Sequence, residues 1–572
     1  MKTIFGYIKP YTLRMCFGLI IKIIGTVMDL AIPYLLSYIV DEVIDTGNIM
    51  DVVKIGLVMI ICAFIGVLGN VIANRMASKV AMNVTRDLRH DLFAKIESLS
   101  FSQMDEVTIP SLISRLSSDT YNIHQMVGMM QRIGVRAPIL LIGGIIITLS
   151  LDTPLALILL ATLPLIVIVS MFVSLKGVPL YTNVQKSIDD LIRSVRENAS
   201  GARVIKALSK GEYEKEKFNK INKKVFDVEM KSGVVMSSLS PTINLILNVG
   251  LVLVLVYGAH RVNNDDIKIG IIMSFTSYFT IILNAMLSIT RIFMIFSRSN
   301  ASAARIDYVL RKEPDLTVDK SIVRKPTDNF IEFNNVNFSY NKALNNINNL
   351  NFSLKKGDKL GIIGSTGSGK TTLINLLMRF YDVDSGEILI NGMNIKGIDN
   401  LELKKMFGVV FQNDTIFNDT IYENISFGRN ISLEEVKKAC DYAQASEFIN
   451  NLPEGLLTVM SPKGTNVSGG QKQRILIARA LCNHPDILIF DDSTSALDYK
   501  TDSLVRKAIN EHFTLSTTII ITQRVSSIKF CDKIIVLEEG EAIGIGTHEE
   551  LVETCEVYKE IYKSQMGGDD DE

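Results

Sequence analysis

The first half of the sequence contains six long apolar segments, at about residues 15–40, 54–74, 133–151, 155–175, 242–259 and 269–297. Several are close to or longer than the ~20 residues that an α-helix needs to cross ~30 Å of hydrocarbon. Helices buried in a soluble core are the alternative, but segments of this number and length do not suit one. We therefore predict an all-α, six-helix transmembrane domain over residues 1–312.

The overall composition indicates two halves of different character. A chain of 572 residues is too long for a single core, and it combines 47% hydrophobic with 21% charged residues. The formal net charge of −1 gives no indication of a nucleic-acid partner, so none is expected. Six cysteines and six histidines are scattered along the chain, which favours neither a disulfide framework nor a metal site made from them.

Loop charges predict how the segments are oriented. Residues 41–51 contain four acidic and no basic residues, whereas residues 75–136 and 176–231 contain eight and thirteen Lys or Arg. The positive-inside rule places these two long connections and both termini on the cytoplasmic side of the cell membrane. Residues 1–13 suit a short interfacial helix, and the N-terminus lacks the cleavage site of a signal peptide.

The two long connections show helical periodicity over more than 50 residues each. Two helices of ~28 residues would each extend ~40 Å beyond the bilayer. Helices that leave a membrane this far usually contact something there. We expect contacts at two turns, Phe101–Asp105 and Ser209–Tyr213.

Three ionisable residues, Lys22, Asp29 and Arg291, lie within or close to the apolar segments. Charges at membrane depth are costly and commonly functional. Lys22 and Asp29 can share one helix face at a spacing of seven residues. Two interpretations stay open: snorkelling or a static internal pair, and contact with a transported substrate.

The second half contains a phosphate loop, G-x-x-x-x-G-K-[ST], between a short apolar run and an amphipathic segment. Its residues are Gly364, Ser365, Thr366, Gly367, Ser368, Gly369, Lys370, Thr371 and Thr372. Glycines let backbone N–H groups close around a phosphate, and the following helix N-terminus adds partial positive charge. The lysine suits the β- and γ-phosphates and the first threonine suits Mg²⁺. The stretch therefore predicts ATP binding.

Short β-type runs surround this loop. Residues 487–490, 517–521 and 533–537 are almost continuously apolar, as expected for a parallel sheet that is buried on both faces. The chain is thus expected to be a multidomain membrane protein, with helical cytoplasmic extensions on its membrane domain. A linker at 313–328 precedes an α/β nucleotide-binding domain at 329–566 and a disordered acidic tail at 567–572.

Four further motifs resemble those of ATP-binding cassette (ABC) transporters. Residues 466–474 resemble the ABC signature, residues 487–498 the Walker B strand and D-loop, residues 410–412 the Q-loop, and residues 338–340 the A-loop. Six spans ahead of one cassette resemble the half-transporter of the exporter class. The resemblance covers nearly the whole chain.

The resemblance implies a role for each motif residue. Tyr340 would stack on adenine, and Asp491 would hold Mg²⁺ together with Thr371 and Gln412, the last of which also reaches the attacking water. The signature residues would bind the γ-phosphate of ATP that is held by a second cassette, so the chain would need to dimerise. These residues are Ser468, Gly469, Gly470 and Gln471.

Two positions depart from the family pattern. The residue after Asp491 is usually the catalytic Glu, and here it is Asp492; the switch histidine is replaced by Gln523. A carboxylate displaced by ~1 Å can lose ~10²-fold in rate, and loss of general-base help costs ~10²–10⁴-fold. In addition, Pro462 stands where exporters usually have an acidic residue, which puts one coupling contact in doubt.

Because both departures fall in one ATP site and the signature is intact, the pattern resembles one chain of a heterodimeric bacterial exporter of the multidrug type. The partner would carry the missing Glu and His. The cargo would be an amphipathic drug, a lipid or an apolar peptide, and the composition does not choose among them. The alternatives are an active homodimer that tolerates both substitutions, and an ATP-gated channel or regulatory subunit.

Overall fold

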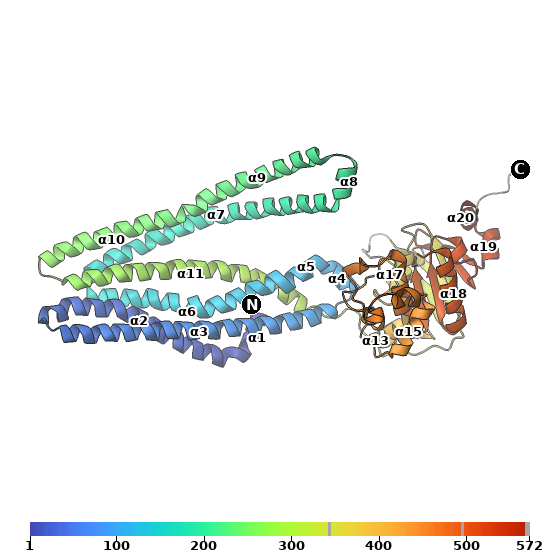
Figure 1. Cartoon of the computed structure of the whole chain (residues 1–572), viewed down its shortest axis with the longest axis horizontal. Coiled ribbons are helices and arrows are strands. Elements are labelled where there is room, and N and C mark those ends of the chain that lie inside the picture. Colours follow the sequence, from blue (N-terminus) through green and yellow to red (C-terminus); the bar gives the residue numbers. More distant parts are fainter. Residues whose placement is uncertain (341, 343–344, 494–496, 567–572) are drawn as a thin grey trace. The chain divides into compact units, whose positions relative to one another are not determined.

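The structure is a computed structural model that describes residues 1–340, 342, 345–493 and 497–566. The predicted tail at 567–572, and positions 494–496 of the D-loop, lie outside the described residues. The chain divides into two compact units (Figure 1). One unit comprises Met1–Glu97 with Pro110–Lys312, and the other comprises Ser98–Ile109 with Glu313–Glu572. We call them the membrane unit and the cassette.

The membrane unit is all-α within the described residues. Its helices are α1 (Lys2–Ile8), α2 (Thr12–Tyr38), α3 (Ile49–Glu97), α5 (Ile109–Ser114), α6 (Thr120–Leu151), α7 (Thr153–Ser200), α8 (Ala202–Ala207), α9 (Gly211–Ser237), α10 (Leu239–Asn263) and α11 (Ile269–Leu310). Short π- and 3₁₀-helical turns join some of them into longer rods.

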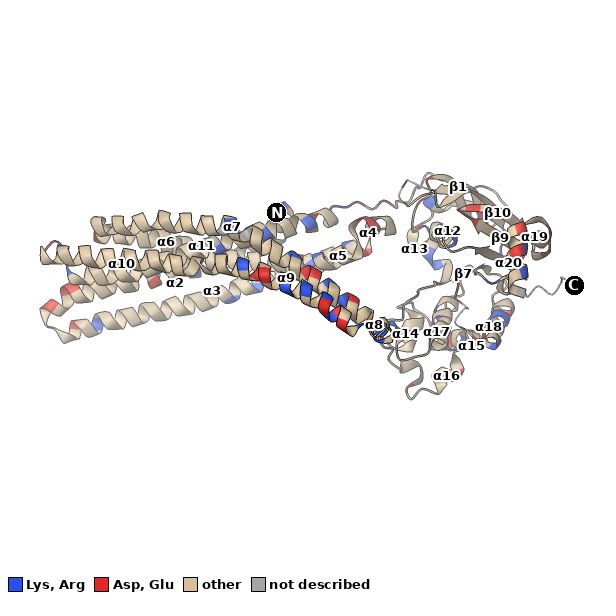
Figure 2. Cartoon of the chain, turned by 90° about the horizontal axis from the view of Figure 1, so that it is seen from above, with Lys and Arg blue, Asp and Glu red and all other residues tan. Residues whose placement is uncertain are grey.

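Six continuous helical stretches of this unit are long and apolar enough to cross a membrane. They run over Lys2–Thr46, Ile49–Glu97, Ile109–Leu151, Thr153–Ser200, Gly211–Asn263 and Ile269–Leu310. Each has 42 to 53 residues, about twice what a bilayer needs. Figure 2 shows the excess: charged residues gather along α9, whereas α10, which continues the same rod, is almost free of them. The prediction of six spanning helices with long polar extensions is confirmed.

Glycines bring α2 and α3 close together. A Cβ added at Gly25 would lie 3.2 Å from the carbonyl oxygen of Gly66, and one added at Gly69 would lie 3.3 Å from that of Ile21. Small residues allow this approach because lipid supplies little hydrophobic driving force between helices, so packing must provide it.

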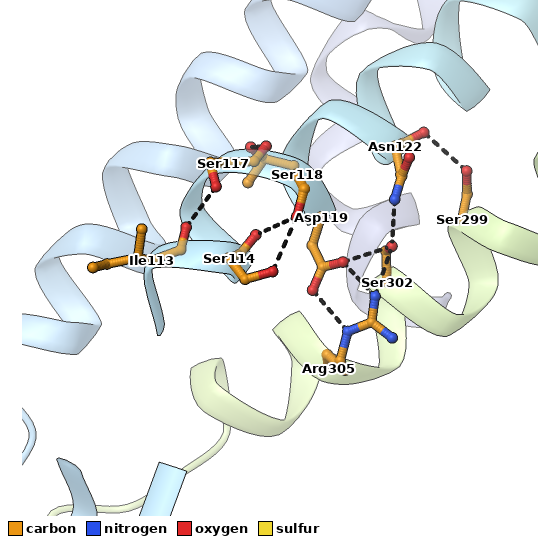
Figure 3. A network of polar contacts seen from close by, with 10 residues as sticks. Ile113, Ser114, Ser117, Ser118, Asp119, Asn122, Ser299, Ser302 and Arg305 are labelled. Atoms are coloured by element: carbon orange, nitrogen blue, oxygen red, sulfur yellow. Dashed lines mark hydrogen bonds and ion pairs between the residues drawn. The ribbon is translucent and has the colours of Figure 1, made fainter. Parts of the chain in front are cut away.

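A polar network joins α11 to the start of α6 (Figure 3). Asp119 ends a π-helical turn, η4 (Arg115–Asp119), and is almost fully buried. Its carboxylate accepts hydrogen bonds from Arg305 Nε (2.8 Å) and from Ser302 Oγ (2.8 Å), and it forms an ion pair with the same guanidinium. Asn122 also donates to Ser302 Oγ (3.0 Å). The charge of Arg305 offsets the free-energy cost of burying the Asp119 carboxylate.

The cassette has two sheets. The strands are β1 (Ile331–Phe338), β2 (Ile347–Leu354), β3 (Lys359–Gly364), β4 (Ser385–Ile390), β5 (Met393–Asn394), β6 (Phe407–Val410), β7 (Ile487–Asp491), β8 (Thr517–Ile521), β9 (Lys533–Glu538) and β10 (Glu541–Gly546). An antiparallel sheet has the order β2-β1-β4-β5, and the larger sheet has the order β10-β9-β3-β8-β7-β6. All strands of the larger sheet except β10 run parallel, and β7 is buried along its whole length, as its apolar run predicts.

Among the described residues of the cassette, nine α-helices come after β3 in the chain. They are α12 (Lys370–Leu377), α13 (Asn400–Lys405), α14 (Ile421–Ser426), α15 (Leu433–Tyr442), α16 (Ser446–Asn450), α17 (Gly469–Leu481), α18 (Tyr499–His512), α19 (His548–Thr554) and α20 (Glu556–Met566). Leu360 and Ile362 of β3 share a core with Leu373 and Leu377 of α12. This core holds the strand and helix on either side of the phosphate loop in place.

One predicted contact tip belongs to the cassette. Residues 101–105, expected as a turn, lie in a helix, α4 (Phe101–Val107), because Ser100 and Gln103 cap its N-terminus reciprocally. The Phe101 and Phe380 ring centroids are 4.4 Å apart, and Tyr381 donates to Asp105 Oδ2 (2.7 Å). Gln103 Nε2 also donates to the backbone oxygen of Glu313 (2.6 Å). Residues 98–109 therefore group with the cassette rather than with the membrane unit.

The second predicted tip differs in detail. The turn covers residues 208–210, since α9 already begins at Gly211 and includes Tyr213. Glu212 and Glu214 in the first turn of α9 interact favourably with the positive end of the helix dipole, which explains the early start.

Candidate ATP-binding site

The phosphate loop joins β3 to α12, and two of its glycines have no substitute. A Cβ at Gly364 would lie 2.1 Å from the backbone oxygen of Leu537, on the neighbouring strand. Gly369 has a φ of +100°, and a Cβ there would lie 2.8 Å from the backbone oxygen of Asn346. Gly367, at φ +88°, has open space around it. The loop is therefore held closely at both ends and leaves its middle open.

Lys370 is the cation of this loop. Its Nζ donates to the backbone oxygens of Gly364 (2.9 Å) and Ser365 (2.6 Å). Burial lowers the pKa of Lys370 from its ordinary value, and the carboxylates of Asp491 and Asp492 offset part of this. A phosphate would supply the counter-charge that the two carbonyl groups do not provide.

The side chains of Thr371 and Asp491 are in contact. The Thr371 hydroxyl donates to Asp491 Oδ2 (3.3 Å), although β8 lies between β3 and β7 in the sheet. Burial raises the pKa of Asp491, and its neighbour Asp492 raises it further. These oxygen atoms suit Mg²⁺, a cation that would relieve the cost of the buried carboxylate.

A cavity of about 300 Å³ collects most of the predicted site residues. Its lining includes Thr366, Gly367, Gly369, Lys370, Thr371, Thr372, Gln412, Asp491, Asp492 and Gln523. Gly364, Ser365 and Ser368 do not line it; Gly364 and Ser368 are buried, and Gly364 lies against the backbone of Leu537. Residues from the ends of β3, β6, β7 and β8 thus meet at one edge of the sheet, where open α/β sheets bind ligands.

Tyr340 lies beside the cavity rather than in its lining. Its hydroxyl donates to Thr372 Oγ1 (3.4 Å) and accepts from Asn375 Nδ2 (3.2 Å). The ring contacts Phe338 and Tyr381 edge-on, with centroids 4.9 and 5.0 Å away, and it is 39% exposed. The Tyr340 hydroxyl contacts Thr372 at the end of the loop. A nucleotide base could therefore stack on the Tyr340 ring while its phosphates bind to the loop.

Asp492 and Gln523 line the same cavity, at the ends of two neighbouring strands. Asp492 has a φ of +48°, and its N–H donates to the backbone oxygen of Ile521 (2.9 Å). Gln523 has an exposed side chain, and its backbone oxygen accepts from Gln565 Nε2 (2.6 Å). The backbone that presents both side chains is thus fixed.

The signature residues are not part of this cavity. Ser468 caps α17 and accepts from the N–H of Gln471 (3.3 Å), while Gln471 Oε1 accepts from the N–H of Ser468 (3.0 Å). Ser468 and Gly469 are exposed, and nothing lies within 4 Å of a Cβ built at Gly469. The helix N-terminus is therefore open to an anion from outside this chain.

The sequence did not indicate Asn346, which also lines the cavity. Its side-chain oxygen accepts from the N–H of Tyr340 (3.1 Å), and its backbone oxygen packs against Gly369. It lies in an asparagine-rich stretch, 345–351, in which no motif distinguishes one amide from the next. Only the pairing of β1 with β2 brings it to the loop.

Comparisons with known proteins agree with this geometry. A family model described as ABC transporter transmembrane region matches residues 15–286, and one described as ABC transporter matches residues 347–495. YfiB of Bacillus subtilis, an uncharacterized ABC transporter ATP-binding protein, is 35% identical over 99% of this chain and 99% of its own length. The chain belongs to the ABC transporter family.

Two further similarities extend this assignment. YknU of Bacillus subtilis, another uncharacterized ABC transporter ATP-binding protein, is 31% identical over 98% of this chain and 96% of its own length. The solved structure of a bacterial Atm1-family ABC exporter with ATP bound matches with a TM-score of 0.83 and 24% identity, covering 98% of this chain and 99% of that chain. This ABC transporter therefore has the fold of an exporter half-transporter.

Proposed function

We propose that this chain is one half of a heterodimeric ABC exporter and that its own ATP site hydrolyses ATP poorly. The observation that carries the proposal is that Asp492 and Gln523, the two departures from the family pattern, line one cavity with Lys370 and Asp491. Both substitutions would therefore affect the same reaction, the hydrolysis of ATP bound to this chain.

The chemistry of each side chain supports this asymmetry. The Asp492 carboxylate is one methylene shorter than that of Glu, so an attacking water at the usual place is out of its direct reach. Gln523 can hydrogen-bond a γ-phosphate but has no titratable proton to exchange. Lys370, Thr371 and Asp491 would still hold Mg²⁺ and the phosphates, so ATP would stay bound without being cut.

The intact signature supports a division of labour. Ser468 and Gly469 at the open N-terminus of α17 would complete the site of a partner chain that carries Glu and His at the two positions. The pair would use ATP binding to turn its cavity outward and hydrolysis in the partner's site to reset it. The cargo would be a small amphipathic compound, moved out across the cytoplasmic membrane with both termini in the cytoplasm.

The test compares the chain alone with the chain co-purified with a second half-transporter encoded beside it. We expect the lone chain to hydrolyse ATP at a few per cent of the rate of the pair, and the pair in vesicles to move substrate uphill. A lone chain that turns over like the pair would show a working homodimer. Passive ion flux on ATP binding, without uphill transport, would show a channel instead.

A further inference from the structure

The membrane unit contains a cavity of about 400 Å³ between α2, α6 and α11. Its walls are mostly apolar, with Ile133, Ala137, Leu140, Ile281 and Ala285 among the lining residues. A polar side is formed by Asp29, Arg136, Asn284 and Ser288. The size falls in the range of roughly 300–1,000 Å³ that small-molecule sites occupy, and the division into an apolar and a polar side suits an amphipathic ligand.

An ion pair forms the polar side. Arg136 donates from its guanidinium to Asp29 Oδ2 (2.9 Å), and Asn70 Nδ2 donates to the same oxygen (3.3 Å). A Cβ at Gly66 would lie 2.7 Å from Asp29 Oδ1, so this glycine makes room for the carboxylate against α3. The Arg136 side chain remains 44% exposed and reaches the cavity. The guanidinium has five N–H donors, and the hydrogen bond to Asp29 uses one of them, so others can bind a ligand.

The charge around this pair is unbalanced. Lys22 is buried and donates to Asn74 Oδ1 (3.0 Å), and its charge interacts with those of Asp29, Arg132 and Arg136. Arg132 donates to the backbone oxygen of Gly128 (3.1 Å). Among the described residues, neither Lys22 nor Arg132 has a carboxylate within 4.0 Å. Of these four neighbouring charged groups, three are cations and one is an anion.

The other acidic residues of the neighbouring helices lie elsewhere. On α3, which packs against α2, Asp51 pairs with Lys54, Asp87 and Asp91 accept hydrogen bonds from Tyr11 and Tyr7, and Glu97 ends the helix. Asp29 is the sole Asp or Glu of α2, and α6 has none. The one acidic residue of α11 is Asp307, near its end, where it pairs with Arg311. Lys22 lies within the first predicted span and Arg136 near one end of the third, and ionisable residues at such positions are costly and commonly functional.

We propose that this cavity binds an amphipathic anion, with one carboxylate or phosphate group against Arg136 and an apolar body along α6 and α11. This deepens the proposed export function and rests on it, since the ligand would be the cargo. Asp29 acts as an internal substitute for the ligand's anion: it holds Arg136 while the cavity is empty and competes with the incoming group. The two partners of one ion pair therefore affect binding in opposite directions.

The test measures binding to the full-length chain in phosphatidylcholine nanodiscs without ATP, with empty nanodiscs as background. The probes are ω-(dansylamino)undecanoic acid, its uncharged methyl ester and the corresponding amine, followed by fluorescence. We expect the acid to bind at least tenfold more tightly than the ester and the amine to bind least. Competition by dodecanoate or by dodecyl phosphate then shows whether the site prefers a carboxylate or a phosphate. Competition by neither would overturn the proposal.

The variants separate ligand recognition from a structural role. We expect Arg136→Gln to weaken binding of the acid about tenfold, the loss of one charge-assisted hydrogen bond, and Asp29→Asn to strengthen it several-fold. Lys54→Gln, which removes an exposed cation at the far end of α3, is the control and should change nothing. If Arg136→Gln and Asp29→Asn both weaken binding, or if the amine binds best, the proposal is wrong.

Because the measurement needs neither ATP nor the partner chain, its outcome is independent of catalytic asymmetry. A chain that binds the acid but never pumps would refute the export function alone. A chain that pumps but binds acid, ester and amine equally would refute the anion site alone.

Discussion

Asp492 shows how far one side chain and its backbone can constrain a reaction. At φ +48° its backbone is in the left-handed region, which Asp adopts more readily than longer side chains do. A Glu at this position would therefore carry a small conformational cost. Under the proposed function, it would also supply the methylene by which Asp492 is shorter than the Glu that the family pattern has at this position.

We expect Asp492→Glu combined with Gln523→His to raise ATP turnover of the lone chain at least tenfold, because general-base help is worth ~10²–10⁴-fold. Phosphate release under saturating Mg-ATP measures this. Asp492→Asn is the control, since it keeps the size and removes the base; it should leave turnover at the basal level. Equal turnover in all three proteins would mean that these two positions do not limit the reaction.

At the scale of elements, α4 is attached to the cassette by a set of aromatic contacts. Phe101 packs on Phe380 and approaches Tyr381, whose ring in turn touches Tyr340 beside the ATP cavity. Side chains in direct contact form a physical path, so occupancy of the adenine position and the docking of α4 can influence each other.

Phe101→Ala should therefore weaken the docking of α4. Its ring is about half exposed, so we expect a loss of about 2 kcal/mol, half of what a fully buried Phe contributes. Transport per ATP hydrolysed, measured for the assembled pair in vesicles, should fall clearly. Leu401→Ala, an exposed apolar residue elsewhere on the cassette, should leave this ratio unchanged. An unchanged ratio in Phe101→Ala would show that this contact carries no coupling.

The network of Figure 3 makes a second prediction at this scale. Arg305→Ala leaves the buried Asp119 carboxylate without its cation, which should destabilise the protein by about 2 kcal/mol. Arg311→Ala removes an exposed pair with Asp307 on the same helix and should cost less than about 0.5 kcal/mol. Thermal unfolding of the detergent-solubilised chains compares the two, and equal shifts in Tm would contradict the role of burial.

At the scale of the whole molecule, the proposed asymmetry predicts that the signature and the phosphate loop of this chain contribute to two different ATP sites. The signature of this chain would serve the partner's competent site, whereas its own phosphate loop would serve the weak one. Defects in this chain's signature and in its catalytic position should therefore differ in severity.

We expect Ser468→Arg in this chain to reduce ATP hydrolysis of the pair by at least ~100-fold. In the proposed pair, the N-terminus of α17 binds the γ-phosphate of the partner's ATP, and a bulky side chain would replace its Ser468 cap. Asp492→Asn in this chain should change the same rate less than about threefold, since the proposal makes this site a weak one from the start. Both are measured on co-purified pairs. Similar losses from the two variants would indicate two equivalent sites and refute the heterodimer proposal.

The sequence by itself determined the architecture. Apolar length decides that segments such as residues 15–40 span a membrane, since lipid cannot hydrogen-bond an open backbone. The phosphate loop is equally local: its glycines, Lys370 and Thr371 lie within nine residues, so their spacing already specifies a phosphate cradle. Both features depend on short-range order along the chain, which a single sequence contains in full.

Only the tertiary structure decided which distant residues meet. It places Asn346 against Gly369, Phe101 against Phe380, and Arg136 rather than Lys22 against Asp29. These pairs depend on strand order, on the docking of α4 and on the rotation of α2 against α6. These contacts depend on how whole helices and strands pack, and the residues next to each partner in the sequence do not specify them.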